Sequence, residues 1–195
     1  MNMLLVDDLA LLAVPETETV NLVGQAGLGH ALAGAEVLER VLHGATLPDE
    51  RAVRALIRGR FRTARNEAIA RLVAAGSIVR VSKAGFFRGE RYGVGPDGRR
   101  ARLAVLVRDA LRPRVADPPV RAALVGCLVQ AGGLSGRVYA GDPDDEALQL
   151  RARALVRGEE RPPALSAALI PVGGSAVLTV IGRAVWAEVQ RAWDD

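Results

Sequence analysis

The sequence predicts a mainly α-helical fold, a single-domain helical bundle over residues 1–195 with one protruding β-hairpin. First, 195 residues is the size of one ordinary domain. Second, 50% of the residues are apolar but only 4% are aromatic, so the core must consist mainly of Ala, Leu and Val, which suits closely packed helices. Third, apolar residues recur at helical spacing along most of the chain, and a strand-like pattern around glycines occurs once.

The expected helices follow from apolar periodicity and from start and stop residues. The first ends at Pro15, and the second is stopped by Gly44. The third begins with proline and acids at Pro48, contains a potential break at Gly59 and is capped by Gly76. Asp-Pro pairs or helical periodicity mark the later ones. The expected spans are residues 4–14, 30–43, 48–75, 99–111, 118–130, 143–157 and 175–193.

Three stretches are expected to behave differently. Residues 16–27 are predicted to form an exposed turn and an irregular link. Residues 77–94, "SIVRVSKAGFFRGERYGV", place apolar and aromatic side chains around two glycines, which predicts a β-hairpin. Residues 162–182 carry no charge and could span a bilayer on length alone. Three prolines and the Gly173-Gly174 pair divide them, so we expect two core segments and a turn.

The third expected helix carries a row of arginines. Steps of 100° per residue place the row within a stripe about 80° wide, whereas Arg60 falls on the opposite side. Adjoining apolar residues at positions 53, 57, 61, 64 and 68 should pack one side of the helix, which leaves a basic ridge on the other. No acid occurs between positions 51 and 66. The ridge consists of Arg51, Arg54, Arg58, Arg62 and Arg65.

The predicted hairpin adds aromatic and basic side chains. Phe86 and Phe87 are adjacent near its tip, close to Lys83 and Arg88. Neighbouring residues of a strand face opposite ways, so one ring is expected to be exposed while the other is buried. An exposed ring beside basic residues is typical of a membrane interface or a partner-binding surface. A hairpin lying flat on the helices with both rings in the core is the alternative.

The net charge of +4 comes almost entirely from arginine, since Lys83 is the only lysine. Arginine binds phosphate and carboxylate bidentately, although a preference for arginine codons would produce the same bias. Two other interpretations of the ridge remain open. It could be a solvated face paired with acids such as Asp7, Asp8, Glu36 or Glu39. A helix followed by a basic hairpin also describes a winged-helix DNA-binding protein, although the large uncharged remainder of the chain makes nucleic acid the less favoured partner.

Enzymatic motifs are not found, and we expect neither catalytic residues, nor a metal site, nor a cofactor. The "GQAGLG" stretch at residues 24–29 has the wrong glycine order for a dinucleotide site. His30 and His43 are too far apart for an HxxxH metal pair. The acids at positions 7–8 and 144–146 are expected to be helix-start charges. Cys127 is expected to be a small core residue.

The predicted location is the cytoplasm. A single cysteine allows no intrachain disulfide. The N-terminal apolar run contains Asp7 and Asp8 and has no preceding basic segment, unlike a secretory signal peptide. The Ala-, Arg- and Gly-rich composition suggests a bacterial chain.

Several stretches together resemble the Golgi phosphoprotein 3 family, and they make this chain similar to a divergent, shortened bacterial member. The similarity spans most of the chain, although each motif is mainly apolar. The family resemblance implies one mainly helical domain with a protruding hairpin. The stretches are "MLLVDDLALLAV", "GLGHALAGAEVLERVLHGATL", "RTARNEAIARLVAAGSIVRV", "DPPVRAALVGCLVQAGGL" and "AVWAEVQRAW".

The resemblance implies binding of phosphatidylinositol 4-phosphate at a membrane surface, without catalysis. Arg62 and Arg65 match two arginines that hold the lipid phosphate in eukaryotic members, and Arg58 of the same ridge joins them as a candidate lipid-phosphate-binding residue. "GFFRG" matches the hairpin that those members use for membrane contact and self-association. The resemblance thus implies a peripherally membrane-associated protein whose partners are an anionic phospholipid headgroup, a second copy of the chain through the hairpin, or another protein.

Three differences from the family pattern weaken this expectation. The pocket tryptophan of the family falls at Val20 and another pocket arginine at Gly29, and neither is kept. The region between positions 47 and 58 is also shorter than in typical members. Losing the two pocket side chains removes about 2–4 kcal/mol of headgroup recognition. We therefore expect weaker and less specific binding of anionic lipid, or a role in protein binding alone.

Overall fold

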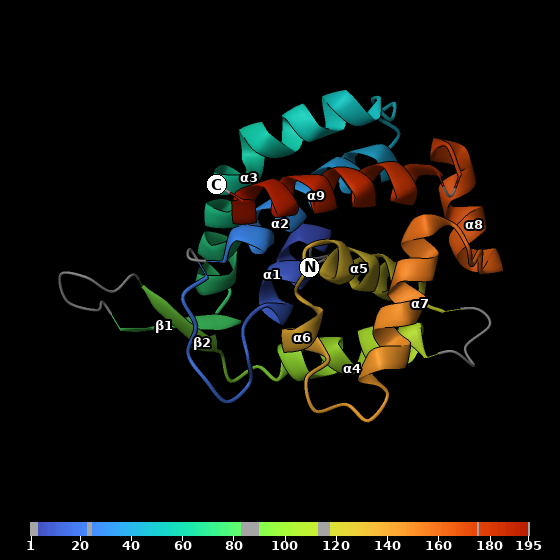
Figure 1. Cartoon of the computed structure of the whole chain (residues 1–195). Helices are drawn as coiled ribbons and strands as arrows, with labels where there is room; N and C mark the ends of the chain where they lie inside the picture. The colour runs from blue at the N-terminus through green and yellow to red at the C-terminus, as the bar shows by residue number, and fades with distance from the viewer. Residues whose placement is uncertain (1–3, 23–24, 83–89, 113–117, 175, 195) are drawn as a thin grey trace.

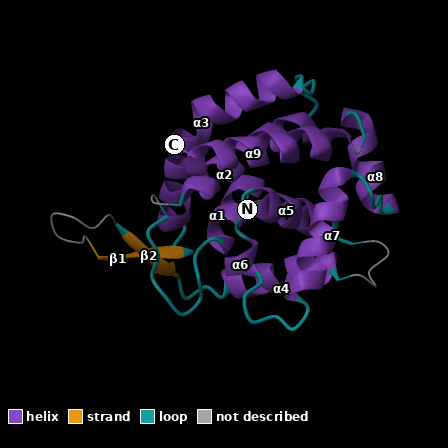
Figure 2. Ribbon diagram, viewed as in Figure 1, coloured by secondary structure: helices purple, strands orange, loops and turns teal. Residues whose placement is uncertain are grey.

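The computed structural model describes residues 4–22, 25–82, 90–112, 118–174 and 176–194. It confirms the mainly α-helical class, and the helices surround a common core with one two-stranded hairpin at the side (Figure 1; Figure 2). In chain order the elements are α1 (Leu5–Leu12), α2 (Ala26–Leu42), α3 (Glu50–Ala74), β1 (Ile78–Ser82), β2 (Arg91–Val94), α4 (Arg99–Leu111), α5 (Val120–Ala131), α6 (Ser135–Val138), α7 (Asp145–Arg157), α8 (Pro163–Leu169), the 3-10 turn η1 (Ile170–Val172) and α9 (Ala176–Asp194).

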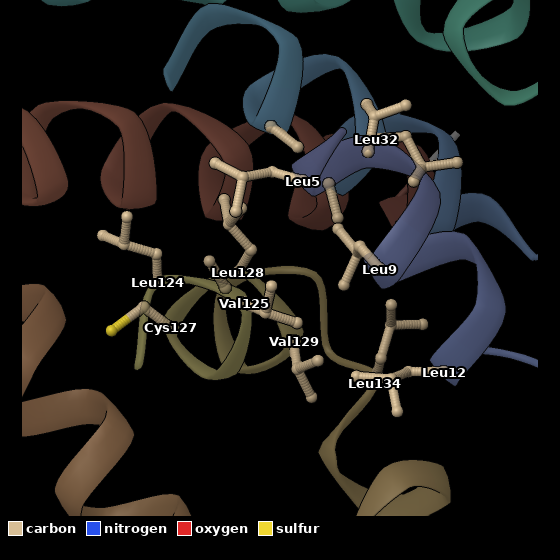
Figure 3. Packing of buried hydrophobic residues seen from close by; sticks show 14 of the residues in the cluster. Leu5, Leu9, Leu12, Leu32, Leu124, Val125, Cys127, Leu128, Val129 and Leu134 are labelled. Atoms are coloured by element: carbon tan, nitrogen blue, oxygen red, sulfur yellow. The ribbon is translucent and has the colours of Figure 1, made fainter. Parts of the chain in front are cut away.

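Two helices form the centre of the core. All eight residues of α1 are buried, and α5 is buried along nearly its whole length. Leu5 and Leu9 of α1 lie next to Val125 and Leu128 of α5 (Figure 3). Cys127 belongs to this core, as predicted, and burial raises the pKa of its thiol to about 12. The core therefore consists mainly of leucine, valine and alanine, in agreement with the low aromatic content.

The helix α3 is continuous, so the potential break at Gly59 is not realised. Asp49 caps its start by accepting a hydrogen bond from the backbone N–H of Ala52 at 2.8 Å. At 25 residues the helix is about 37 Å long. It packs along α2 and α9, and its second half also contacts α1 (Figure 1). Its length and packing hold the arginine ridge at fixed positions relative to three other helices.

One helix begins well before its predicted start, and one short helix was not predicted. The helix α2 begins at Ala26 rather than near position 30, so the last four residues of "GQAGLG" are helical. A Cβ on Gly27 would lie 2.2 Å from the backbone oxygen of Gly132, which shows that close packing against the end of α5 requires glycine here. The short helix α6 was not predicted.

The predicted hairpin is present as two antiparallel strands, β1 and β2. Val20 forms an isolated bridge with Tyr92 of β2, with both backbone hydrogen bonds at 2.9 Å. The segment that was predicted as an irregular link thus forms backbone hydrogen bonds with β2. Tyr92 itself is buried and reaches the core, which anchors the hairpin to the helical body.

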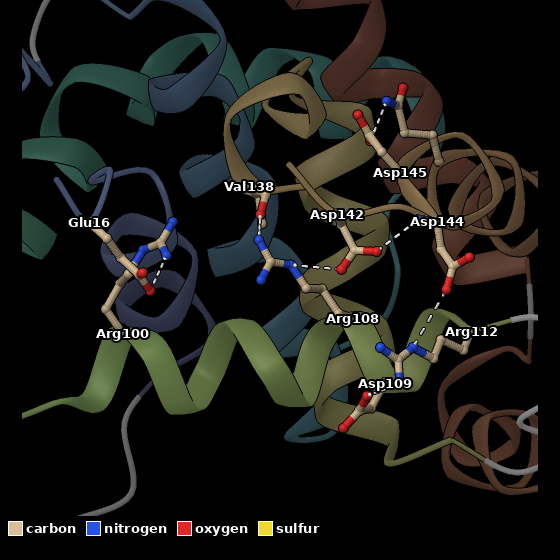
Figure 4. Close-up of polar contacts among 10 residues, drawn as sticks. Glu16, Arg100, Arg108, Asp109, Arg112, Val138, Asp142, Asp144 and Asp145 are labelled. Atoms are coloured by element: carbon tan, nitrogen blue, oxygen red, sulfur yellow. Dashed lines mark hydrogen bonds and ion pairs between the residues drawn. The ribbon is translucent and has the colours of Figure 1, made fainter. Parts of the chain in front are cut away.

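The acids predicted as helix-start charges occupy those positions. Asp145 and Glu146 lie in the first turn of α7, and Asp144 is its N-cap residue. The preceding segment is held by α4, because Nε of Arg108 lies 3.6 Å from Oδ2 of Asp142 (Figure 4). Across the described residues, no group of three or more His, Cys, Asp or Glu side chains is arranged to hold a metal ion.

The uncharged stretch near the C-terminus forms α8, η1 and the first part of α9, which is the predicted pair of segments around a turn. Among the described residues, no single helix has both the length and the hydropathy needed to cross a membrane. Residues Pro163–Val172 and Ala176–Asp194 reach that length and hydropathy only together, and they are bent by 85° relative to each other.

Candidate anion-binding site

The arginine ridge lies on α3 as the helical spacing predicts. The apolar side of the helix is buried at Val53, Ile57, Ala64 and Ala68. Arg51, Arg58 and Arg62 are exposed, and Arg54 is half-buried. Arg65, at the edge between the two sides, is buried with 9% of its surface exposed. The ridge therefore runs from solvent into the body of the protein.

The first part of the ridge is neutralised by neighbouring acids. Nη2 of Arg54 donates to Glu50 at 2.7 Å, one helical turn earlier. Nε of Arg58 lies 3.2 Å from Oε2 of Glu188 on α9. Arg58 therefore shares its charge with a carboxylate, which lowers its value for binding an external anion. Arg58 was predicted as a lipid-binding residue from its position on the ridge, and its contact with Glu188 was not predicted.

Glu188 is the main residue that the sequence analysis missed. It is 2% exposed, and its Oε2 is also 2.9 Å from Nη1 of Arg191. A buried carboxylate is stabilised when two guanidinium groups surround it. The helical periodicity of α9 contains a signal for it, because Glu188 follows Val185 and Ala184 at helical spacing and thus falls on the buried side.

The acids proposed as internal partners of the ridge do not pair with it. Asp7 pairs with Arg71 at 2.8 Å and Asp8 with Arg121 at 2.7 Å. Glu36 pairs with Arg60, which points away from the ridge, and the backbone N–H of Leu5 donates to Glu39 at 3.3 Å. These carboxylates fasten α1 and α2 to their neighbours, and none of the four pairs with Arg62.

Arg62 and Arg65 form the positively charged end of the ridge. The guanidinium carbon of Arg62 lies 5.3 Å from the centre of the Phe61 ring, a cation–π contact. Within the part of the chain that the structure describes, no carboxylate oxygen lies within 4.0 Å of the Arg62 guanidinium. The pKa of Arg65 is lowered, first by burial of its guanidinium and second by the positive charge of Arg62. Two guanidinium groups thus lie close together at this end of the ridge, and an oxyanion beside them would be attracted to both.

Phe61 connects this pair to α2. Its ring stacks on the buried imidazole of His30, with the ring centres 4.7 Å apart and the planes inclined by 7°. A Cβ on Gly29 would lie 2.8 Å from the backbone oxygen of Phe61 and 3.2 Å from its ring. The position where the family pattern has an arginine is thus occupied by the contact between α2 and α3. Val20, where that pattern has a tryptophan, pairs with β2.

The hairpin candidates lie outside the described residues, because Lys83, Phe86, Phe87 and Arg88 all fall within positions 83–89. The described strands leading to them expose an apolar surface on β1, where Val79 is 40% and Val81 54% exposed.

A comparison with family models identifies the chain as similar to Golgi phosphoprotein 3 (GPP34). The match covers residues 40–170, about two thirds of the 195 residues, and includes α3 and both strands of the hairpin. A search of curated proteins gives no match. The matched region thus contains the positively charged end of the ridge and the element that follows it.

Proposed function

The chain belongs to the Golgi phosphoprotein 3 family, and we propose that it binds anionic phospholipid headgroups at a membrane surface through Arg62 and Arg65. The observation that carries the proposal is the electrostatic state of this pair. Arg62 is exposed, and the pKa of Arg65 is lowered first by burial of the Arg65 guanidinium and second by the positive charge of Arg62. A phosphate monoester beside the pair would neutralise two adjacent guanidinium groups and accept several charge-assisted hydrogen bonds from them.

The proposed ligand is a phosphate-bearing headgroup of the phosphatidylinositol 4-phosphate kind, bound with modest selectivity. The contact between Gly29 and Phe61 leaves no room for a third arginine at that position, and Val20 supplies no indole ring. Fewer directional contacts around the phosphate mean that the charge of the lipid contributes more to affinity than the inositol ring does. Arg58 contributes less than Arg62 because Glu188 already neutralises it.

The protein would act as a peripheral, cytoplasmic binding protein and not as an enzyme. In the sequence, Phe86 and Phe87 follow the exposed valines of β1, and the hairpin is proposed to add apolar contact with the membrane or with a second copy of the chain. Combining an electrostatic and an apolar contact is the general requirement for stable peripheral binding.

The test is sedimentation with three kinds of vesicle. The first contains phosphatidylcholine alone, the second contains about 20% phosphatidylserine so that its surface is clearly anionic, and the third contains phosphatidylinositol 4-phosphate at the same surface charge as the second. We expect binding to both anionic vesicles. Arg62→Ala with Arg65→Ala should weaken it by about 100-fold or more, since two charge-assisted contacts are lost. The charge-matched control changes Arg137 and Arg161, both exposed and outside α3, to Ala. Phe86→Ser with Phe87→Ser should weaken binding less.

Three outcomes would contradict the proposal. Equal loss of binding in the control pair would show that only net charge matters. A salt-sensitive shift of random duplex DNA by the same arginines, with no vesicle binding, would favour the winged-helix alternative. Binding of neither vesicle nor DNA, with capture of a specific protein, would favour a protein-interaction scaffold.

A further inference from the structure

A concave surface lies between α7, α9 and the C-terminal end of α5. It encloses about 590 Å³. The two helices approach closely at its floor, where a Cβ on Gly182 would lie 2.5 Å from Cγ1 of Val156. Longer side chains on either side of this contact, Arg153 on α7 and Trp186 on α9, form walls. No residue of α3 is among the described residues that line it, so it is separate from the arginine ridge.

The lining is basic. Arg153, Arg157 and Arg183 are all exposed and come from two helices. Glu159 is the acid in the lining, and it lies 3.7 Å from Nη1 of Arg157. Among the described carboxylates, none is within 4.0 Å of the guanidinium groups of Arg153 or Arg183. Three guanidinium groups and one carboxylate leave the lining with a net charge of +2.

The same surface exposes aromatic rings. Trp186 lines it with 45% of its surface exposed, and Trp193, 58% exposed, contacts Trp186 edge to face at a ring separation of 6.3 Å. These are the two tryptophans of the chain. Gln130 adds a polar group, and Oγ of Ser135 orients its amide by donating to Oε1 at 2.8 Å. The exposed indole rings leave apolar surface in water that a ligand would cover, and the adjacent arginines are hydrated cations that can bind an anionic group of that ligand.

We propose that this pocket binds a small molecule that combines a planar ring with a phosphate monoester, as a nucleoside monophosphate does. A phosphate monoester carries a charge of about −1.5 to −2 at pH 7, which matches the charge of the lining. Guanidinium groups bind its oxygens bidentately. A planar ring can stack on the indole of Trp186, which gains contact area even in a half-open pocket. The volume is within the range of small-molecule sites.

The test uses adenosine monophosphate as the probe and the fluorescence of Trp186 as the signal. In the Trp193→Phe variant, all tryptophan emission comes from the pocket. We expect saturable quenching with a Kd between about 10 µM and 1 mM. Adenosine, which lacks the phosphate, and inorganic phosphate, which lacks the ring, should each bind at least about tenfold more weakly.

Variants assign the binding to the pocket. Arg183→Gln and Arg153→Gln should each weaken binding about tenfold, because each removes a charge-assisted contact with the phosphate. Arg137→Gln, on α6 and outside the lining, should leave the Kd unchanged. Arg62→Ala should also leave it unchanged, which separates this site from the proposed lipid site.

The proposal is overturned if quenching does not saturate below about 1 mM, or if Arg183→Gln and Arg153→Gln bind as tightly as the parent. Equal affinity for adenosine would also overturn the proposal, because the pocket would then recognise the ring without the phosphate. Tighter binding of an oligonucleotide without a terminal phosphate would overturn the small-molecule assignment in favour of single-stranded nucleic acid.

Discussion

Arg100 and Arg62 carry the same guanidinium group in opposite surroundings. Arg100 is 4% exposed, and it donates to the backbone oxygen of Val14 at 2.9 Å and to Glu16 at 2.6 Å (Figure 4). Arg62 lies in solvent beside the ring of Phe61. The contrast shows that the high arginine content of the chain does not identify a binding site by itself. The immediate surroundings of each guanidinium decide whether it stabilises the fold or remains available to an anion.

The region around α1 shows the structural use of arginine most clearly. Asp7 and Asp8 are buried in its first turn, and Arg71 and Arg121 reach them from α3 and α5. Burial raises the pKa of Asp8, and the charge of Arg121 opposes that effect. These arginines therefore compensate for acids inside the protein. At the α3 ridge, the buried acid Glu188 pairs with Arg58 and not with Arg62.

The largest expected effect is on stability. Arg100→Ala should lower the free energy of unfolding by about 3 kcal/mol, because the backbone oxygen of Val14 at the end of α1 loses a buried donor. Arg62→Ala should change it by no more than about 0.5 kcal/mol, as expected for an exposed residue. Urea denaturation measures both. Similar destabilisation by the two variants would remove the distinction between structural and available arginines.

A smaller effect on stability is expected from alanine substitutions at two glycines near the ridge, one closely packed and one exposed. Gly29→Ala should destabilise the protein by about 1–3 kcal/mol, because the new methyl group meets the backbone oxygen of Phe61. Gly59→Ala, within α3 and with nothing within 4 Å of its Cβ, should stabilise it by up to about 1 kcal/mol through helix propensity. Thermal unfolding of the two variants gives the comparison. If both changed stability in the same direction, the proposed contact between α2 and α3 would be wrong.

The smallest effect concerns the acid that neutralises the ridge. Glu188→Gln removes the negative charge between Arg58 and Arg191 and should raise affinity for anionic vesicles about 3- to 10-fold. Glu146→Gln, an exposed acid at the start of α7, is the charge-matched control and should have an effect of less than about twofold. The same gain in both variants would indicate a response to net charge alone.

Local patterns allowed the sequence to predict the long helices, the hairpin and the face of α3 that carries the arginines. Periodicity determines these features within one element, and the structure confirms them. The early start of α2 was missed because Gly27 and Gly29 have low helix propensity. Close packing against Gly132 and Phe61 overrides that propensity, and it cannot be read from the α2 sequence alone.

The candidate site was predicted less completely for the same reason. The positions of Arg62 and Arg65 follow from helical spacing, but the burial of Arg65 depends on the neighbouring helices. The pairing of Arg58 joins α3 to α9, which lie far apart in the sequence. Such contacts between distant elements decide which charges are neutralised, and periodicity within one helix carries no information about them.

The most direct measurement is the affinity of Arg62→Ala for phosphatidylinositol 4-phosphate vesicles, compared with Arg137→Ala in the same titration. Both variants remove one exposed positive charge, but only Arg62 lies beside Arg65. We expect Arg62→Ala to bind about tenfold more weakly than the parent, with Arg137→Ala within about twofold of it. Equal affinities of the two variants would contradict the proposal that Arg62 and Arg65 form the lipid-binding site.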